Sequence, residues 1–175
     1  MPPAFMVVPT TNARTAVRML HKSNAAAAKL YLAGSKVGSW TSHANASMAS
    51  GARAVVDGFD WYVKSHAADG RTFKDLDKEA VVVLSAGSVS ARVDVVLDDG
   101  DDLSGRVVLW DGPDLAPGSA PVIACAFAIA MRTIYPARRV TTIGVWQARR
   151  QQLVEVPFAQ AIAHTSAANS ILASL

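Results

Sequence analysis

The chain contains one cysteine, Cys125, among its 175 residues. A single cysteine excludes an intramolecular disulfide and a zinc site built from several cysteines. Residues 1–9 also lack the basic and apolar regions of a signal peptide, so we expect a cytoplasmic protein. The longest uncharged apolar run, residues 121–131, is shorter than the about 20 residues that cross a bilayer, and we expect no membrane partner.

Four common catalytic motifs are missing as well. The sequence has no G-x-x-x-x-G-K-S/T phosphate loop, no G-x-G-x-x-G fingerprint, no H-E-x-x-H zinc motif and no G-x-S-x-G nucleophile elbow. The histidines are far apart in the sequence, so a metal cluster would have to be assembled by the fold. Cys125 stands between alanines in an apolar run, which predicts a buried side chain and not a nucleophile.

Acidic residues are absent from the first third of the chain. Residues 1–56 carry six Lys or Arg and no acid, residues 57–114 carry thirteen of the fourteen acids, and residues 115–175 carry five Arg and one Glu. Basic surface attracts nucleic-acid phosphates, although scattered bases also fit the exposed faces of ordinary helices. The candidate nucleic-acid contacts are Arg14, Arg18, Lys22, Lys29, Arg138, Arg139, Arg149 and Arg150.

Hydrophobic spacing predicts an α+β (α/β) fold with a central mixed sheet of about five strands flanked by helices. We expect a single domain over residues 1–175, with a basic helical segment at 1–43 and a C-terminal helix at 157–175. Residues 10–12 are predicted to cap the first helix, and residues 35–42 to form a connector. The remaining expected helices span residues 23–32, 44–65 and 119–134, and the strands residues 80–84, 89–97, 106–110, 140–147 and 151–156.

Asp94 is the most informative acidic residue. It lies inside a valine-rich strand on the same face as Arg92, and a carboxylate in that place needs a partner. A salt bridge to Arg92 or Arg106 would satisfy it, and the alternative is a metal ion, with Asp111 as a loop residue or a second ligand. The acids at 98–102 lack EF-hand spacing and predict an exposed hairpin turn.

The runs 79–83, 89–97 and 105–112, followed by an apolar helix and a strand pair, resemble the PD-(D/E)XK nuclease superfamily in its RecB-like branch. The resemblance covers residues 44–160, which we expect to form a nuclease-like core. In that family, two acids hold magnesium and a lysine helps to activate the attacking water. The resemblance implies Asp94 as a metal ligand. Asp111 and Glu79 are the further metal-ligand candidates, and Asp94 and Asp111 are the catalytic candidates.

The sequence departs from the family at the second acid and at the lysine. If Leu109-Trp110-Asp111 replaces the family's D-Y-K motif, leucine stands for the acid and aspartate for the lysine; if Asp111 is the acid, Pro113 stands for the lysine. We therefore expect a noncatalytic nuclease-like domain that needs no cofactor and binds nucleic acid or a nucleic-acid-processing protein.

Two other functions remain open. The first is an active magnesium-dependent nuclease in which Arg92 or Arg106 replaces the lysine, although arginine is a poor base. The second is a structural or assembly protein that forms a homo-oligomer or part of a larger complex, since its alanine-rich segments allow close helix packing.

Overall fold

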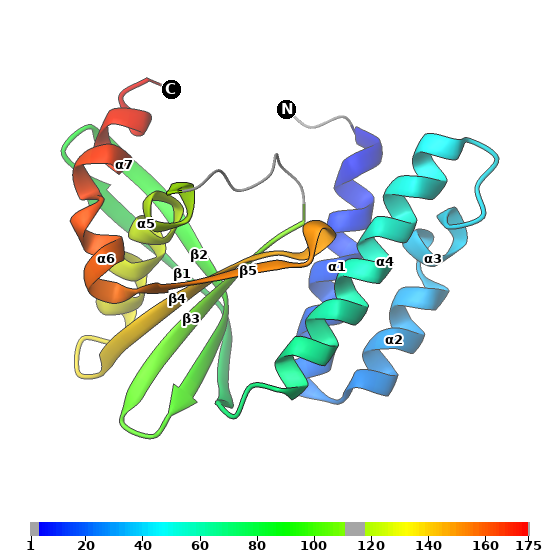
Figure 1. Ribbon diagram of the computed structural model, residues 1–175, viewed down its shortest axis with the longest axis horizontal. Helices are drawn as coiled ribbons and strands as arrows, with labels where there is room; N and C mark the ends of the chain where they lie inside the picture. Colours follow the sequence, from blue (N-terminus) through cyan, green and yellow to red (C-terminus); the bar gives the residue numbers. More distant parts are fainter. Residues whose placement is uncertain (1–3, 111–117, 175) are drawn as a thin grey trace. The chain divides into compact units, whose positions relative to one another are not determined.

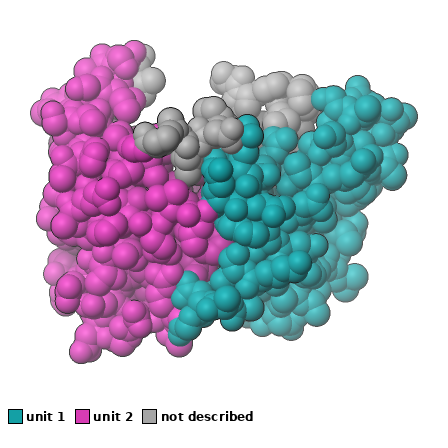
Figure 2. Space-filling view, viewed as in Figure 1, with its two compact units in different colours: residues 1–70, 110–112, 147–152 teal, residues 71–109, 113–146, 153–175 magenta. Residues whose placement is uncertain are grey.

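The computed structural model describes residues 4–110 and 118–174. The chain forms two compact units, which Figure 2 distinguishes by colour. The first, here called the helical unit, comprises residues 1–70, 110–112 and 147–152. The second, the sheet unit, comprises residues 71–109, 113–146 and 153–175. Each unit is built from its own pattern of residues.

The helical unit contains α1 (Ala4–Lys22), α2 (Ala25–Gly34), α3 (Lys36–Trp40) and α4 (Ala46–Ala67), and α1 packs against both α2 and α4 (Figure 1). Asparagines begin two of these helices. The side chain of Asn24 accepts the N–H of Ala27, and that of Asn45 accepts the N–H groups of Ser47 and Met48. These side chains satisfy N–H groups that have no carbonyl partner within the helix. The short helix η1 (Ala148–Arg150) also packs on α4.

Three expectations about the helices were wrong. The first helix begins at Ala4 and not after a cap at residues 10–12; threonine is accommodated inside it, as the Thr15 hydroxyl donates to the Thr11 carbonyl. The expected connector at 35–42 contains α3. The C-terminal helix is divided into α6 (Phe158–Ala163) and α7 (Thr165–Leu172), because the backbone of His164 leaves helical geometry. No helix in the described ranges is long and apolar enough to cross a membrane.

The sheet unit confirms the predicted α+β class with a five-stranded mixed sheet. The strands β1 (Thr72–Leu84), β2 (Gly87–Asp99) and β3 (Asp102–Leu109) form the expected antiparallel meander. The helix α5 (Ser119–Ile134) then leads to β4 (Arg139–Gln147), which neighbours β3, and β5 (Gln152–Pro157) completes the order β1-β2-β3-β4-β5. β1 begins earlier than predicted because an edge strand tolerates charged residues such as those between Lys74 and Glu79.

The core of the sheet unit lies between the sheet and α5, with α6 and α7 on the same side (Figure 1). On β1, Val82 and Leu84 are buried with Ala130 of α5, while Val81 and Val83 point away and are 65% and 77% exposed. Alternation along the strand therefore divides the valines into a core face and an outer face.

Candidate functional site

Asp94, the residue on which the nuclease resemblance depends, takes part in strand pairing. The residue pairs between β2 and β3 run from Asp99/Asp102 to Val95/Arg106. Asp94 is the next residue of β2, and its side chain makes the next hydrogen bond to β3. Its Oδ2 atom accepts the backbone N–H of Val108 at 2.8 Å, and the residue is only 8% exposed. A charge-assisted hydrogen bond of this kind is stronger than a neutral one. The carboxylate thus satisfies a buried backbone donor of β3.

Arg92, one of the two expected salt-bridge partners of Asp94, lies beside it. Its Nη2 atom is 3.8 Å from Asp94 Oδ1. The β1–β2 register places Glu79 directly opposite Arg92, so the guanidinium lies between two carboxylate-bearing positions on one face. The exposed Glu79 also accepts a hydrogen bond from the Ser90 hydroxyl. The cation that the structure places beside Asp94 is an arginine.

Asp111, another of the three proposed metal ligands, lies outside the described residues. Among the residues that the structure does describe, no group of three or more His, Cys, Asp or Glu side chains could hold a metal ion. Arg106, the second expected partner of Asp94, is fully buried, and its guanidinium lies 4.6 Å from the centre of the Trp146 ring. A cation over an aromatic face is favourable when it is removed from water. Arg106 is therefore part of the packing of the sheet unit.

Among the basic candidates, Lys29, Arg138 and Arg139 form ion pairs within their own unit. Lys29 Nζ is 2.7 Å from Asp60 Oδ1 in the helical unit. In the sheet unit, Arg138 binds Asp98 at 2.9 Å and also donates to the carbonyls of Gly100 and Asp101. Arg139 is 3.7 Å from Asp102. The acidic turn, residues 98–102 where β2 leads into β3, is thus compensated by arginines that follow α5.

The acidic turn has an altered electrostatic environment at Asp98. Its hydrogen bond to Arg138 lowers the pKa of the Asp98 carboxyl below its ordinary value of 3.8, assisted by Lys74 at 3.3 Å. Gly100 has φ of +70° in this turn, a conformation that favours glycine. The turn is a structural element in which two basic side chains converge on one carboxylate.

The remaining basic candidates are at or near the surface of the helical unit. Arg14 and Lys22 of α1 are exposed and Arg18 is half-buried. They are spaced four residues apart, and they lie on the side of α1 away from its buried residues Ala13, Ala16 and Val17. Arg149 and Arg150 lie on η1. The structure therefore places these five candidates in the helical unit, three of them in one row on α1.

The helical unit also contains features that sequence reasoning missed. The first is a ring cluster: His21 Nε2 is 2.9 Å from the Tyr62 hydroxyl, and the rings of His21 and His66 are 4.4 Å apart. These residues come from α1 and α4, and their separation in the sequence gave no signal of the contact.

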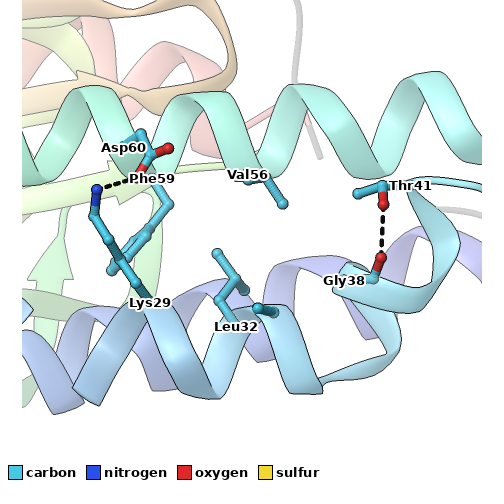
Figure 3. A pocket seen from close by; sticks show the side chains of 8 residues that line it. Lys29, Leu32, Gly38, Thr41, Val56, Phe59 and Asp60 are labelled. Carbon is cyan, nitrogen blue, oxygen red and sulfur yellow. Dashed lines mark hydrogen bonds and ion pairs between the residues drawn. The ribbon is translucent and has the colours of Figure 1, made fainter. Parts of the chain in front are cut away.

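The second is a cavity of about 330 Å³ between α2, α3 and α4. Figure 3 shows the apolar side chains of Leu32, Val56 and Phe59 between the Lys29–Asp60 ion pair and the hydrogen bond from Thr41 to the Gly38 carbonyl. The cavity is at the small end of the size range of ligand pockets, and both polar groups at its ends already have partners.

The comparisons with known proteins add no relative. No family model, no curated protein and no solved structure matches the chain.

Proposed function

We propose that the protein is a noncatalytic domain that binds nucleic acid through the phosphate backbone. The observation that carries the proposal is the row of Arg14, Arg18 and Lys22 on α1. Residues four apart on a helix are separated by about 6 Å along its axis. This spacing is close to twice the axial rise of about 3.4 Å per phosphate along one strand of duplex DNA.

The charge of the helical unit supports this role. The unit contains nine Lys and Arg against four Asp, a net charge of +5, whereas the sheet unit contains eight bases against ten acids, a net charge of −2. The sequence of α1 contains no acidic residue. A basic surface of this kind attracts phosphates, and binding releases their counterions.

The contacts of Asp94 support the noncatalytic part of the proposal. A magnesium ligand presents its carboxylate oxygens to the ion and its waters. In this chain one Asp94 oxygen binds the N–H of Val108 and the other lies near Arg92. The residue that transfers most directly from the nuclease family is therefore occupied with the fold of β2 and β3.

The salt dependence of DNA binding tests the proposal. Fluorescence anisotropy with a labelled DNA duplex measures the association constant at several salt concentrations. A plot of its logarithm against the logarithm of the salt concentration should have a slope of about −2.7, the value for three phosphate contacts. In the Arg14→Ala/Lys22→Ala variant the slope should become shallower, about −0.9, because one phosphate contact remains. The affinity should fall about tenfold or more at low salt.

Arg132→Ala is the matched control, because Arg132 is an exposed base on α5 of the sheet unit. It should leave the slope unchanged. An equal loss of slope in both variants, or no binding by the wild type, would contradict the proposal. Cleavage of the same DNA in magnesium or manganese that disappears in Asp94→Asn would establish the nuclease alternative instead.

A further inference from the structure

β1 is the first strand in the order of the sheet, so one of its sides has no neighbouring strand in the order. Its pairing with β2 runs without interruption from Lys78/Val93 to Leu84/Gly87. Along this stretch Val81 and Val83 are among the most exposed large apolar side chains of the described chain. The second half of β1 is thus a regular, apolar strand at a sheet edge.

The two halves of β1 differ in how the edge is protected. Natural edge strands avoid pairing with other chains through charges, prolines and irregular backbone. The first half has such protection: a register shift between Phe73 and Asp75, a φ of 52° at Asp77, and charged residues from Lys74 to Glu79. Residues 80–84, Ala-Val-Val-Val-Leu, contain no charge and no proline. This segment has the composition of a strand that pairs with another strand.

We propose that a second copy of this chain pairs with residues 80–84 of β1 in antiparallel orientation, forming one sheet across two copies. The outer backbone N–H and C=O groups of an edge strand bind another extended strand, and the side chains then select which strand fits. The segment itself supplies a suitable partner, because its own sequence is complementary about a central residue.

The complementarity follows from the two faces of the strand. Directly opposite residues in an antiparallel pair point to the same face, so a two-fold axis must lie on a residue. With the axis on Val82, Val81 of one copy lies opposite Val83 of the other, and this pair occurs twice. Glu79 then lies opposite Ser85, and no like charges meet. With the axis on Glu79 or Lys78, each of these charges would face its own copy.

The size of the contact determines the expected strength. Stable dimers bury about 800 Å² on each partner, and an edge of five to seven residues buries less. We therefore expect a reversible dimer whose population depends on concentration. Sedimentation velocity over a concentration series measures this directly, and a wild-type chain that stays monomeric at all concentrations would overturn the proposal.

Lysine substitutions on the outer face test the surface. Val81→Lys and Val83→Lys place ammonium groups opposite an apolar partner and add a charge to the edge, so the dissociation constant should rise at least about tenfold. Val154→Lys on β5, the other edge, is the matched control, because Val154 is also apolar and 38% exposed. Val83→Thr is the conservative variant: threonine keeps the β-strand preference of valine, so this variant should fold even if a lysine variant does not. Equal weakening by Val83→Lys and Val154→Lys would overturn the proposal.

Disulfide trapping tests the register. When Val81→Cys and Val83→Cys chains are mixed and oxidised, a covalent dimer of the two should form, since opposite residues have Cα atoms within disulfide range. Each variant alone should remain uncrosslinked, because the axis on Val82 separates identical positions. Cys125 is buried and common to all samples. Crosslinking of Val81→Cys with itself would overturn the register around Val82.

Discussion

The helical unit and the sheet unit are packed from different layers. In the helical unit helices pack against helices, and small buried residues let the helices approach closely: Ala13, Ala16, Ala28, Ala49 and Ala52. In the sheet unit α5 packs on a sheet, and its buried alanines, such as Ala124, lie in one core with larger side chains such as Leu103 and Ile143. Side chains from the sheet and the helix interdigitate in that core.

The two units also use charge differently. In the sheet unit, acids and bases bind each other within the fold, as Arg138 does with Asp98 and Arg71 with Glu155. In the helical unit, bases outnumber acids and a row of them lies on the outer side of α1. Charge that is paired inside a unit contributes to its stability, while a net excess of basic charge on a unit attracts ligands of opposite sign.

Two glycine substitutions test the difference in packing, and the first has the largest effect expected here. A Cβ atom added to Gly58 of α4 would lie 2.5 Å from the carbonyl oxygen of Ala148, and backbone cannot move aside easily. Gly58→Ala should therefore lower the free energy of unfolding by about 3 kcal/mol or more, despite the better helix propensity of alanine. Urea unfolding followed by circular dichroism measures the loss.

Gly105→Ala is the matched substitution in the sheet unit. Its Cβ would meet side-chain atoms of Ile143 and Val93 at 3.1 Å and of Met131 at 3.3 Å. Side chains can shift by a few tenths of an ångström, so we expect a loss of about 1 kcal/mol. If the two variants lose the same stability, the contrast between backbone packing and side-chain packing is wrong.

Sequence patterns predicted the sheet unit better than the helical unit. Valine-rich runs and polar turns located the meander, α5 and the β4–β5 pair, because period-two spacing and turn residues are local signals. The helices of the first unit also have local signals, but threonine and serine fit both caps and helices, so their ends were misplaced.

The contacts of the candidate site could be predicted only in part. The position of Asp94 in a strand required a partner, and Arg92 was one of the partners expected from its place on the same face. The hydrogen bond from Val108 depends on where β2–β3 pairing ends, which no local pattern encodes. The same holds for Arg138, which meets Asp98 from 40 residues away. Such contacts come from the topology of the sheet.

Substitutions at Asp94 should have the next largest effect. Asp94→Ala leaves the N–H of Val108 without its carboxylate acceptor, and loss of a buried charge-assisted hydrogen bond costs about 2 kcal/mol. Asp94→Asn keeps an oxygen acceptor and should cost about half as much. Chemical denaturation compares the two variants. A variant of either kind with unchanged stability would show that Asp94 is not a structural residue and would reopen its role as a ligand.

A smaller effect is expected from the acidic turn, and it depends on pH. Because Arg138 and Lys74 lower the pKa of Asp98 in the folded protein, the ionised carboxylate stabilises the fold above its ordinary pKa of 3.8. This contribution is lost as the pH falls through the lowered folded pKa. Asp98→Asn should therefore lower the free energy of unfolding at neutral pH and reduce the loss of stability in acid. Asp101→Asn, an exposed change in the same turn, is the control for the loss of one acid there.

The smallest effect concerns Tyr135, which follows α5 and donates a hydrogen bond to Asp75 Oδ2 at 3.2 Å. Burial, together with the negative charge of Asp75, raises the pKa of Tyr135 to about 12. The raised pKa contributes stability that is fully present below the ordinary value of 10.0 and is lost as the pH rises through about 12. Asp75→Asn removes the charge but leaves the burial, so the pKa should fall only part of the way towards 10.0. Titration of tyrosinate absorbance, with Tyr135→Phe to identify the signal, measures the change. A complete return to 10.0 would mean that the charge of Asp75, and not burial, dominates at this end of the sheet unit.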